Sequence, residues 1–273
     1  MFTNYRYVHK CFIKLYERHP QRCIQKEHNN TLVFVKYMTT TIGFPIPTTS
    51  RGCNWTSVKD SHLFKLMLPN FFATYTPEYN YKFYIGIDDD DPLYSQPEQQ
   101  ELIKKVFSRY PNMTVSIVSM SGIPKGHLTK MWNRLLKMAY EEGCDYFYIC
   151  GDDIIVETPG WMKKAVEILK EHNNIGITGP MSCNGNTNII TQTFISRLHW
   201  KLFGCAFPEE IKNWYCDDWI NLIYRPEYVY LMPEYKSYNL GGKERYDIVR
   251  GQGILNYLVK RDRATLENYL KVL

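Results

Sequence analysis

Segments rich in β-branched and aromatic residues alternate with segments of helical periodicity along most of the 273-residue chain. This alternation predicts an α/β fold with a mostly parallel sheet flanked by helices, because parallel strands need crossover connections that are usually helical. The expected strands are residues 32–37, 39–47, 82–87, 113–118, 145–150 and 175–178. The expected helices are residues 58–68, 97–109, 126–142 and 159–171, the last with Thr158 as N-cap and Pro159 in its first position.

Basic residues concentrate in the first 38 positions, which hold seven Lys and Arg against two Glu. Of the 33 basic and 28 acidic residues in the chain, the remainder therefore contains 26 of each and is neutral. A neutral body argues against a nucleic-acid enzyme, whose affinity depends on clustered Lys and Arg. Residues 1–30 are expected to form one or two helices with a solvated basic face, which also suits peripheral contact with an anionic membrane surface.

The sequence shows no stretch near the roughly 20 apolar residues of a membrane-spanning helix, and the N-terminus lacks the apolar core of a signal peptide. Its eight cysteines include no C-x-x-C pair, so we expect reduced thiols. These features predict a cytoplasmic protein with a basic N-terminal extension, residues 1–38, and a single domain, residues 39–273.

Polar and acidic residues follow three of the expected strands. Thr48-Thr49-Ser50-Arg51 follows the second, Asp88 to Asp91 the third, and Gly151-Asp152-Asp153 the fifth. Parallel strands bring their carboxyl ends to one edge of a sheet, where ligands of such folds bind. Two acidic clusters at one edge favour a bound cation, although Asp88 to Asp91, before Pro92, also suits a solvated turn.

Several of these stretches resemble GT-A fold glycosyltransferases, the nucleotide-sugar-dependent enzymes with a metal-binding D-x-D motif and a Rossmann-like sheet. The matching stretches are Ile46 to Arg51, Tyr84 to Pro92 (YIGIDDDDP), Lys130 to Asn133, Cys144 to Ile154, Thr158 to Trp161 and Asn213 to Trp219. The sequence of Tyr84 to Pro92 is most similar to that of glycosyltransferases of large algal DNA viruses. The resemblance implies a donor half at about 39–155 and an acceptor half at about 156–273.

The resemblance also implies a donor site, with Asp153 as ligand of Mn²⁺ or Mg²⁺. Its nucleotide-sugar-binding residues would be Thr48, Ser50, Arg51, Asp88, Asp89, Asp90, Lys130, Asn133, Asp152 and Asp153. Gly151 stands at the first D-x-D position and leaves only two carboxylates. Ordinary polarity of a helix surface is the alternative for Lys130 and Asn133. No histidine follows His199, so the late histidine ligand of some family members is absent.

For catalysis, the resemblance implies that Asp217 or Asp218 takes the proton of the acceptor hydroxyl, with Asp218 as the better match. The alternatives are that Asp217 caps a helix over about 217–224, or that the enzyme retains configuration. Trp214 and Trp219 are candidate acceptor contacts, with the hydrophobic core as the alternative. Lys243 and Arg245, in a glycine-containing loop, are candidates for stabilising the diphosphate, with an ordinary surface loop as the alternative.

We therefore expect a metal-dependent hexosyl- or pentosyltransferase that moves a sugar from a nucleotide diphosphate donor, most simply a UDP-sugar, to a glycan hydroxyl with inversion. A sugar-phosphate nucleotidyltransferase is one alternative, but Pro47 to Gly52 is a poor match to the Gly-rich loop of that class. A non-catalytic glycan- or nucleotide-binding module is the other, because Gly151 departs from the metal motif.

Overall fold

The structure is a computed structural model that describes residues 27–28, 31–32 and 39–273. The chain divides into two units, Met1–Met38 and Thr39–Leu273. In the first unit, strands β1 (Glu27–His28) and β2 (Thr31–Leu32) pair antiparallel. The helices expected over 1–30 and the membrane contact expected for them lie outside the described residues, as does most of the strand expected over 32–37.

An eight-stranded sheet forms the centre of the second unit, in the order β5-β4-β3-β6-β9-β8-β10-β7. The strands are β3 (Thr41–Thr48), β4 (Asn80–Ile87), β5 (Met113–Ser119), β6 (Tyr146–Ile149), β7 (Ile154–Val156), β8 (Ile177–Ser182), β9 (Thr193–Ser196) and β10 (Val229–Asn239). β5, β4, β3 and β6 are parallel neighbours and β8 pairs parallel with β10, whereas β9 and β7 are antiparallel to their neighbours. The expected α/β fold is confirmed, with an antiparallel part that the sequence patterns did not indicate.

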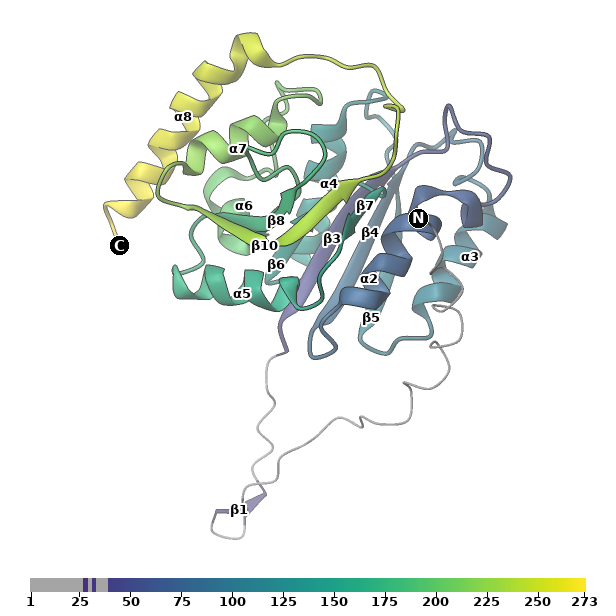
Figure 1. Cartoon of the computed structure of the whole chain (residues 1–273), viewed down its shortest axis with the longest axis horizontal. Helices are drawn as coiled ribbons and strands as arrows, with labels where there is room; N and C mark the ends of the chain where they lie inside the picture. The colour runs from purple at the N-terminus through teal and green to yellow at the C-terminus, as the bar shows by residue number, and fades with distance from the viewer. Residues whose placement is uncertain (1–26, 29–30, 33–38) are drawn as a thin grey trace. The chain divides into compact units, whose positions relative to one another are not determined.

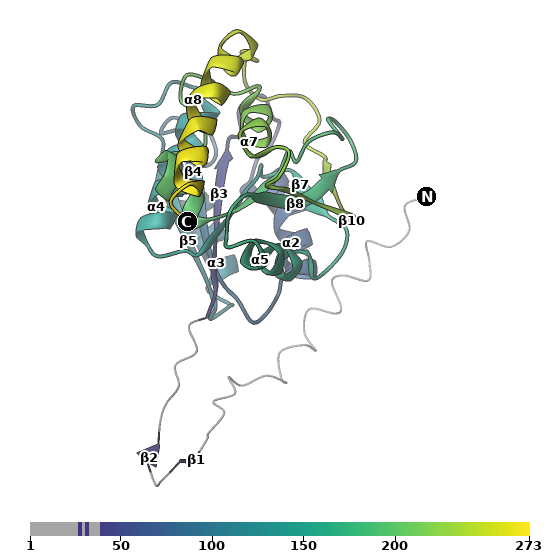
Figure 2. The same ribbon diagram turned by 90° about the vertical axis from the view of Figure 1, so that its left-hand side faces the viewer.

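Helices cover both faces of this sheet (Figures 1 and 2). They are α2 (Leu68–Thr74), α3 (Pro97–Phe107), α4 (Leu128–Glu141), α5 (Trp161–Glu171), α6 (Arg197–Phe203), α7 (Cys216–Tyr224) and α8 (Gln252–Leu270). One core lies under α2, α3 and α5, and the other under α4, α6, α7 and α8. Phe83 and Tyr84 are neighbours on β4 but belong to opposite cores, because successive side chains of a strand alternate between its faces.

Two of the expected helices begin or run differently. The segment expected as one helix over 58–68 is a short 3-10 turn (Val58–Asp60) and a π-helical turn (Leu63–Met67) that leads into α2. Helix α5 begins at Trp161, two residues later than expected, and Thr158 is not its N-cap. Gly160 is the N-cap and has a φ of 87°, a left-handed conformation that turns the chain before the helix can start.

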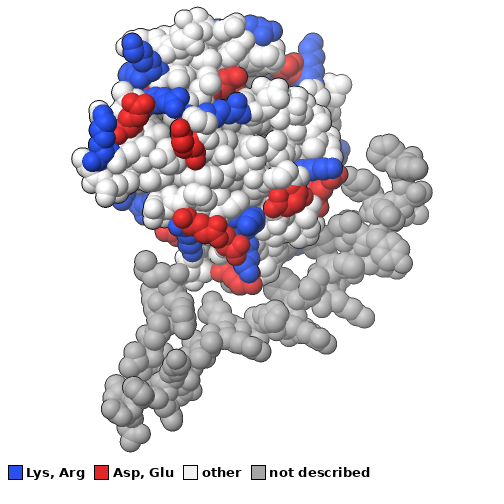
Figure 3. Space-filling model, turned by 60° about the vertical axis from the view of Figure 1, so that its left-hand side comes forward, with Lys and Arg blue, Asp and Glu red and all other residues white. Residues whose placement is uncertain are grey.

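Basic and acidic side chains are interspersed on the face of the molecule in Figure 3, as expected for a neutral domain. Some form ion pairs along one helix, as Lys137 does with Glu141 on α4. Within the described residues, no helix is long and apolar enough to cross a membrane. The six cysteines of that part are free thiols.

Candidate functional site

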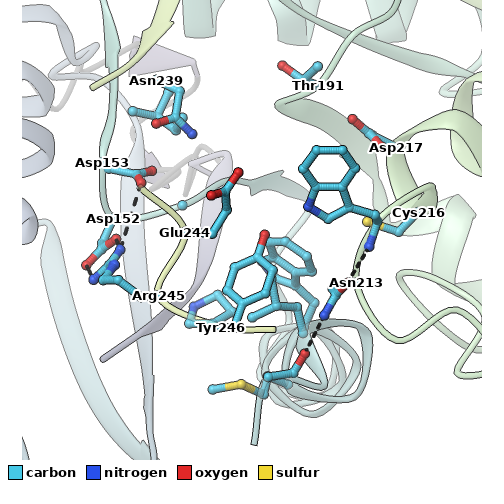
Figure 4. Close-up of a pocket in the computed structure, with 18 of the residues that line it drawn as sticks. Asp152, Asp153, Thr191, Asn213, Cys216, Asp217, Asn239, Glu244, Arg245 and Tyr246 are labelled. Atoms are coloured by element: carbon cyan, nitrogen blue, oxygen red, sulfur yellow. Dashed lines mark hydrogen bonds and ion pairs between the residues drawn. The ribbon is translucent and has the colours of Figure 1, made fainter. Parts of the chain in front are cut away.

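A cavity of about 1060 Å³ opens at the carboxyl ends of the strands and extends to the start of α7 (Figure 4). Its walls come from the ends of β3, β6, β8 and β10, from the segment before α7, and from the loop between β10 and α8. This edge is where ligands of open α/β sheets bind. The expected site residues that line the cavity are Thr48, Arg51, Asp88, Asp152, Asp153, Trp214, Asp217, Asp218, Lys243 and Arg245.

Asp152 is a buried carboxylate, 1% exposed, that two other segments of the chain hold in place. The hydroxyl of Thr48, the last residue of β3, donates a hydrogen bond of 2.5 Å to Oδ2 of Asp152. Arg245 donates to both oxygens of the same carboxylate, with 3.1 Å between Nη1 and Oδ2, and to the carbonyl oxygen of Thr49 at 2.7 Å. Such a two-pronged charged contact offsets the cost of burying both groups. Asp152 and Arg245 therefore fasten the loop after β10 across the strand ends.

Asp153 differs from Asp152, because its carboxylate accepts no hydrogen bond from another residue of the described part. Its nearest cation is Arg245, with 3.8 Å between Nη2 and Oδ2. Burial, and then the charge of Asp152, raise the pKa of Asp153 to about 6 against the opposing effect of Arg245. A Cβ atom on Gly151 would lie 2.5 Å from Oδ1 of Asp153, and one on Gly241 would overlap Oδ2. Because Gly151 and Gly241 have no side chain, the Asp153 carboxylate has room between them.

A metal ion fits the side chains around Asp153. His62, at the start of the π-helical turn, forms a cluster with Asp152 and Asp153 in which one ligand atom from each lies within 4.8 Å of the others. Burial lowers the pKa of His62, so its imidazole is neutral at neutral pH and has a free lone pair. Carboxylates suit Mg²⁺ and Mn²⁺, so this donor set is chemically suited to the cation expected at Asp153.

Asp91 is the aspartate after β4 that organises the neighbouring loops. It is fully buried, and its carboxylate accepts hydrogen bonds from the hydroxyls of Thr49 and Ser50 and from the backbone N–H groups of Ser50, Leu93 and Tyr94. Burial alone would raise the pKa of Asp91, but these hydrogen bonds lower it. Ser50, an expected donor contact, is buried and does not line the cavity. It serves to hold the loop after β3 against the loop after β4.

The other three aspartates of this run lie differently. Asp88 lines the cavity beside Arg51, with 3.7 Å between Oδ2 and Nε, and burial raises the pKa of Asp88. Asp89 and Asp90 are exposed and do not line the cavity. Their carboxylates accept hydrogen bonds from Ser119 and from Lys125, respectively, and Asp90 also pairs with Arg51. Of the expected nucleoside contacts in this run, only Asp88 faces the cavity.

A second acidic pair, Asp217 and Asp218, lines the cavity in the first turn of α7. The N-cap of α7 is Tyr215, which has a φ of 76°, so Asp217 lies inside the helix and does not cap it. Oδ1 of Asp217 accepts a hydrogen bond of 3.1 Å from the N–H of Asp218. Burial, and then the charge of Asp218, raise the pKa of Asp217 to about 6. An acid with such a pKa is well matched to proton transfer near neutral pH.

Three further expected site residues, like Ser50, Asp89 and Asp90, do not line the cavity. Lys130, on α4, has its Nζ 3.7 Å from a carboxylate oxygen of Glu209. Asn133 is buried, and its Oδ1 accepts hydrogen bonds from two backbone N–H groups of the loop after α6. Trp219 is fully buried and donates its Nε1–H to Asp262 at 3.0 Å. Asn133 and Trp219 thus make contacts inside the fold and Lys130 lies near the surface beside Glu209, and the donor and acceptor roles expected for the three stay predictions.

The loop between β10 and α8 contributes more to the cavity than its two expected cations. Figure 4 shows Glu244 and Tyr246 in the middle of the cavity, and burial raises the pKa of Tyr246 to about 12. Lys243 is exposed at the wall and has no ion-pair partner among the described residues. Trp214 pairs with the end of this loop, where its backbone forms a β-bridge with Arg250 and the guanidinium of Arg250 lies 4.9 Å from the centre of its ring. No sequence signal distinguished Glu244 and Tyr246 from ordinary loop residues.

No protein-family model and no curated protein matches the sequence. Solved structures do match. Residues 1–349 of S. aureus TarS in complex with UDP-GlcNAc align with a TM-score of 0.56 and 14% identity over 82% of this chain and 66% of that chain. The same TarS fragment with UDP gives 0.54 and 13% over 82% and 65%. GalNAc-T7 with UDP, GalNAc and Mn²⁺ gives 0.52 and 9% over 78% and 47%.

The fold is similar to that of GT-A glycosyltransferases. The chain spans slightly less than two thirds of these TarS chains and about half of the GalNAc-T7 chain. At 9 to 14% identity the likeness concerns the fold. The expected resemblance to viral enzymes stays a prediction.

Proposed function

We propose that the chain is a glycosyltransferase that moves a hexose or pentose from a UDP-sugar to a hydroxyl of a glycan, using a divalent cation and inverting the anomeric configuration. The observation that carries this proposal is the pairing of two acidic sites in one cavity. Asp152 and Asp153 lie at the strand ends, and Asp217 and Asp218 lie at the start of α7. The similar folds of TarS and GalNAc-T7, which hold UDP or UDP-GlcNAc, support the nucleotide.

The nucleoside is proposed to lie where β3 and β4 end. Thr48, Arg51 and Asp88 line this part of the cavity. The Asp88 carboxylate can accept hydrogen bonds from a ribose hydroxyl or from the N–H of uracil, and the Arg51 guanidinium can donate to a carbonyl oxygen of the base. Asp91 holds the loop after β3 against the loop after β4, because its carboxylate accepts hydrogen bonds from the hydroxyls of Thr49 and Ser50.

The diphosphate is proposed to lie between Asp153 and Lys243. A divalent cation held by Asp153 would stabilise the negative charge that develops on the leaving diphosphate. Lys243, in the loop between β10 and α8, has no ion-pair partner among the described residues and can bring a second positive charge to the diphosphate. Arg245 was also expected to stabilise the diphosphate, but its guanidinium is already paired with Asp152. We therefore assign Arg245 to holding the loop and Lys243 to contacting the phosphates.

The base is proposed to be Asp217. In the transfer step, the acceptor oxygen bonds to the anomeric carbon while the bond from that carbon to the phosphate oxygen breaks. The hydroxyl proton goes to the Asp217 carboxylate, and the electron pair of the broken bond leaves with UDP. With a pKa of about 6, Asp217 is ionised at pH 7 and still basic enough to accept the proton. Asp218, the better match in sequence, supplies the charge that helps raise this pKa.

The acceptor is proposed to bind between Trp214 and the loop after β10. The ring of Trp214 lines the cavity next to the acidic pair, where an aromatic face can stack on a sugar ring. Glu244 and Tyr246 face the same space and offer hydrogen bonds to sugar hydroxyls. A sugar bound in this way would present a hydroxyl to Asp217.

The test is turnover of a panel of UDP-sugars by the full chain with Mn²⁺. Turnover is measured as release of UDP, and NMR gives the anomeric configuration of the sugar product. An α-linked donor should give a product of β configuration, with water or an added glycan as acceptor. Asp217→Asn should keep donor binding and lose roughly 10²- to 10⁴-fold in rate. Pyrophosphate release from UTP and a sugar phosphate would instead indicate a nucleotidyltransferase, and donor binding without turnover a binding module.

A further inference from the structure

His62 is a polar side chain close to Asp152 and Asp153 to which neither the fold nor the sequence motifs assign a role. Its Nδ1 is buried and has no hydrogen-bond partner among the described residues. The edge contact with Trp55, at 4.9 Å between ring centres and 80° between planes, fixes the orientation of the imidazole. A buried nitrogen without a partner is costly unless a ligand satisfies it.

The two aspartates next to His62 differ in what remains free on them. Both oxygens of Asp152 already accept hydrogen bonds, from Arg245 on each side and from Thr48 on Oδ2. The Arg245 charge is thus matched by Asp152, whereas the Asp153 carboxylate has no hydrogen-bond donor in the described part. Asp153, whose carboxylate accepts no hydrogen bond from another described residue, and His62, whose Nδ1 has no partner there, are therefore the two members of the cluster with unpaired polar atoms.

We propose that His62 is a direct ligand of the divalent cation, together with Asp153. The ion would connect the segment that follows β3 with the loop between β6 and β7, two parts of the chain about ninety residues apart. Asp152, whose oxygens are already hydrogen-bonded to Arg245, lies beside the ion and is not one of its proposed ligands. This inference deepens the proposed function, because the same cation would face the donor diphosphate, but the ion site can be tested with the metal alone.

An imidazole ligand also affects which ion binds. Mg²⁺ prefers oxygen ligands and is held mainly by carboxylates and water, whereas first-row transition metals accept nitrogen readily. We therefore expect the wild-type chain to bind Mn²⁺ more tightly than Mg²⁺, and His62→Gln to lose most of this preference. Loss of a metal ligand should weaken Mn²⁺ binding by roughly tenfold or more.

The experiment measures Mn²⁺ binding to the full chain by EPR titration, and nitrogen coupling to the bound ion by electron spin-echo modulation. The variants are His62→Gln, Asp153→Asn and the matched control His172→Gln. His172, at the end of α5, stacks on Tyr230 and does not line the cavity. Thermal unfolding of each variant confirms that it is folded.

We expect nitrogen modulation in the wild type and in His172→Gln, and none in His62→Gln, whose Mn²⁺ affinity falls. Asp153→Asn should bind Mn²⁺ at least as weakly as His62→Gln. Modulation that persists in His62→Gln, or its absence in a wild-type chain that binds Mn²⁺, would overturn the inference, as would a wild-type chain that does not bind Mn²⁺. If His62 loading is found but UDP does not bind, the inference stands and the proposed function fails. If UDP and Mn²⁺ bind together without nitrogen modulation, the inference about His62 fails and the proposed function stands.

Discussion

Replacing Asp217 with asparagine should slow transfer by roughly 10²- to 10⁴-fold and at the same time stabilise the folded protein. Asparagine has the shape of the protonated acid, and its side-chain oxygen can still accept the hydrogen bond from the N–H of Asp218. What the variant removes is the buried negative charge. A residue that only supported the fold would destabilise the protein when replaced, so the sign of the effect separates the two roles.

The magnitude follows from the pKa of Asp217, which rises from 3.8 to about 6 on folding. Below pH 3.8 the acid is protonated in both states and costs nothing. Between these two pH values the folded state keeps a proton that the unfolded state releases, so wild-type stability falls as the pH rises. At about 1.4 kcal/mol per pKa unit, the cost above pH 6 is about 3 kcal/mol. For a domain of this size, this corresponds to a gain of roughly 6 to 12 °C in Tm for the variant at pH 8.

The assay is urea unfolding of the wild type and of Asp217→Asn at pH 4 and pH 8, with tryptophan fluorescence as the signal that reports unfolding. The control is Asp218→Asn, which removes the neighbouring charge but leaves the buried carboxylate, so its gain at pH 8 should be less than half as large. Equal stability of Asp217→Asn and wild type at pH 8 would refute the reasoning. So would a gain of the same size at pH 4.

Three further changes test the donor side. Arg245→Met leaves the buried charge of Asp152 without its cation, so we expect a loss of about 3 to 5 kcal/mol in unfolding free energy by urea denaturation; a loss below 1 kcal/mol would contradict the pairing. Gly151→Asp adds a carboxylate at the first position of the expected D-x-D motif, but its Cβ would lie 2.5 Å from Oδ1 of Asp153, so Mn²⁺ affinity by calorimetry should fall rather than rise. Lys243→Met should raise KM for the donor at unchanged Tm, and an unchanged KM would remove Lys243 from the diphosphate site.

The strands with clear β-branched and aromatic runs could be predicted from sequence, and with them the edge of the sheet where the site lies. Thr48, Asp88 and Asp152 follow or end such strands, and the parallel arrangement alone brings them together. β10 was not predicted, because its eleven residues include Pro233 and the register shifts between Met232 and Lys236. A proline and an irregular register obscure the alternation on which such predictions depend.

The division of labour within the acidic runs could not be predicted. Asp88 and Asp91 belong to one run of four aspartates, and only the loop geometry makes one a cavity residue and the other a buried anchor. His62 is a lone histidine near a helix start and carries no motif. Trp219 looks like an acceptor platform beside the acidic pair, but the helical turn directs it into the core, toward Asp262. Contacts between segments far apart in the chain decide each of these cases.

The most direct test of the central claim is calorimetric titration of the full chain with UDP-glucose, UDP-galactose, UDP-xylose, UDP-GlcNAc, GDP-mannose and GDP-fucose, first with Mn²⁺ and then with a chelator. We predict that a UDP-sugar binds, that the chelator abolishes binding, and that Asp153→Ala removes the dependence on metal together with most of the affinity. Absence of binding by every donor under both conditions, in a chain shown to be folded, would contradict the claim that the cavity at the strand ends is a nucleotide-sugar site.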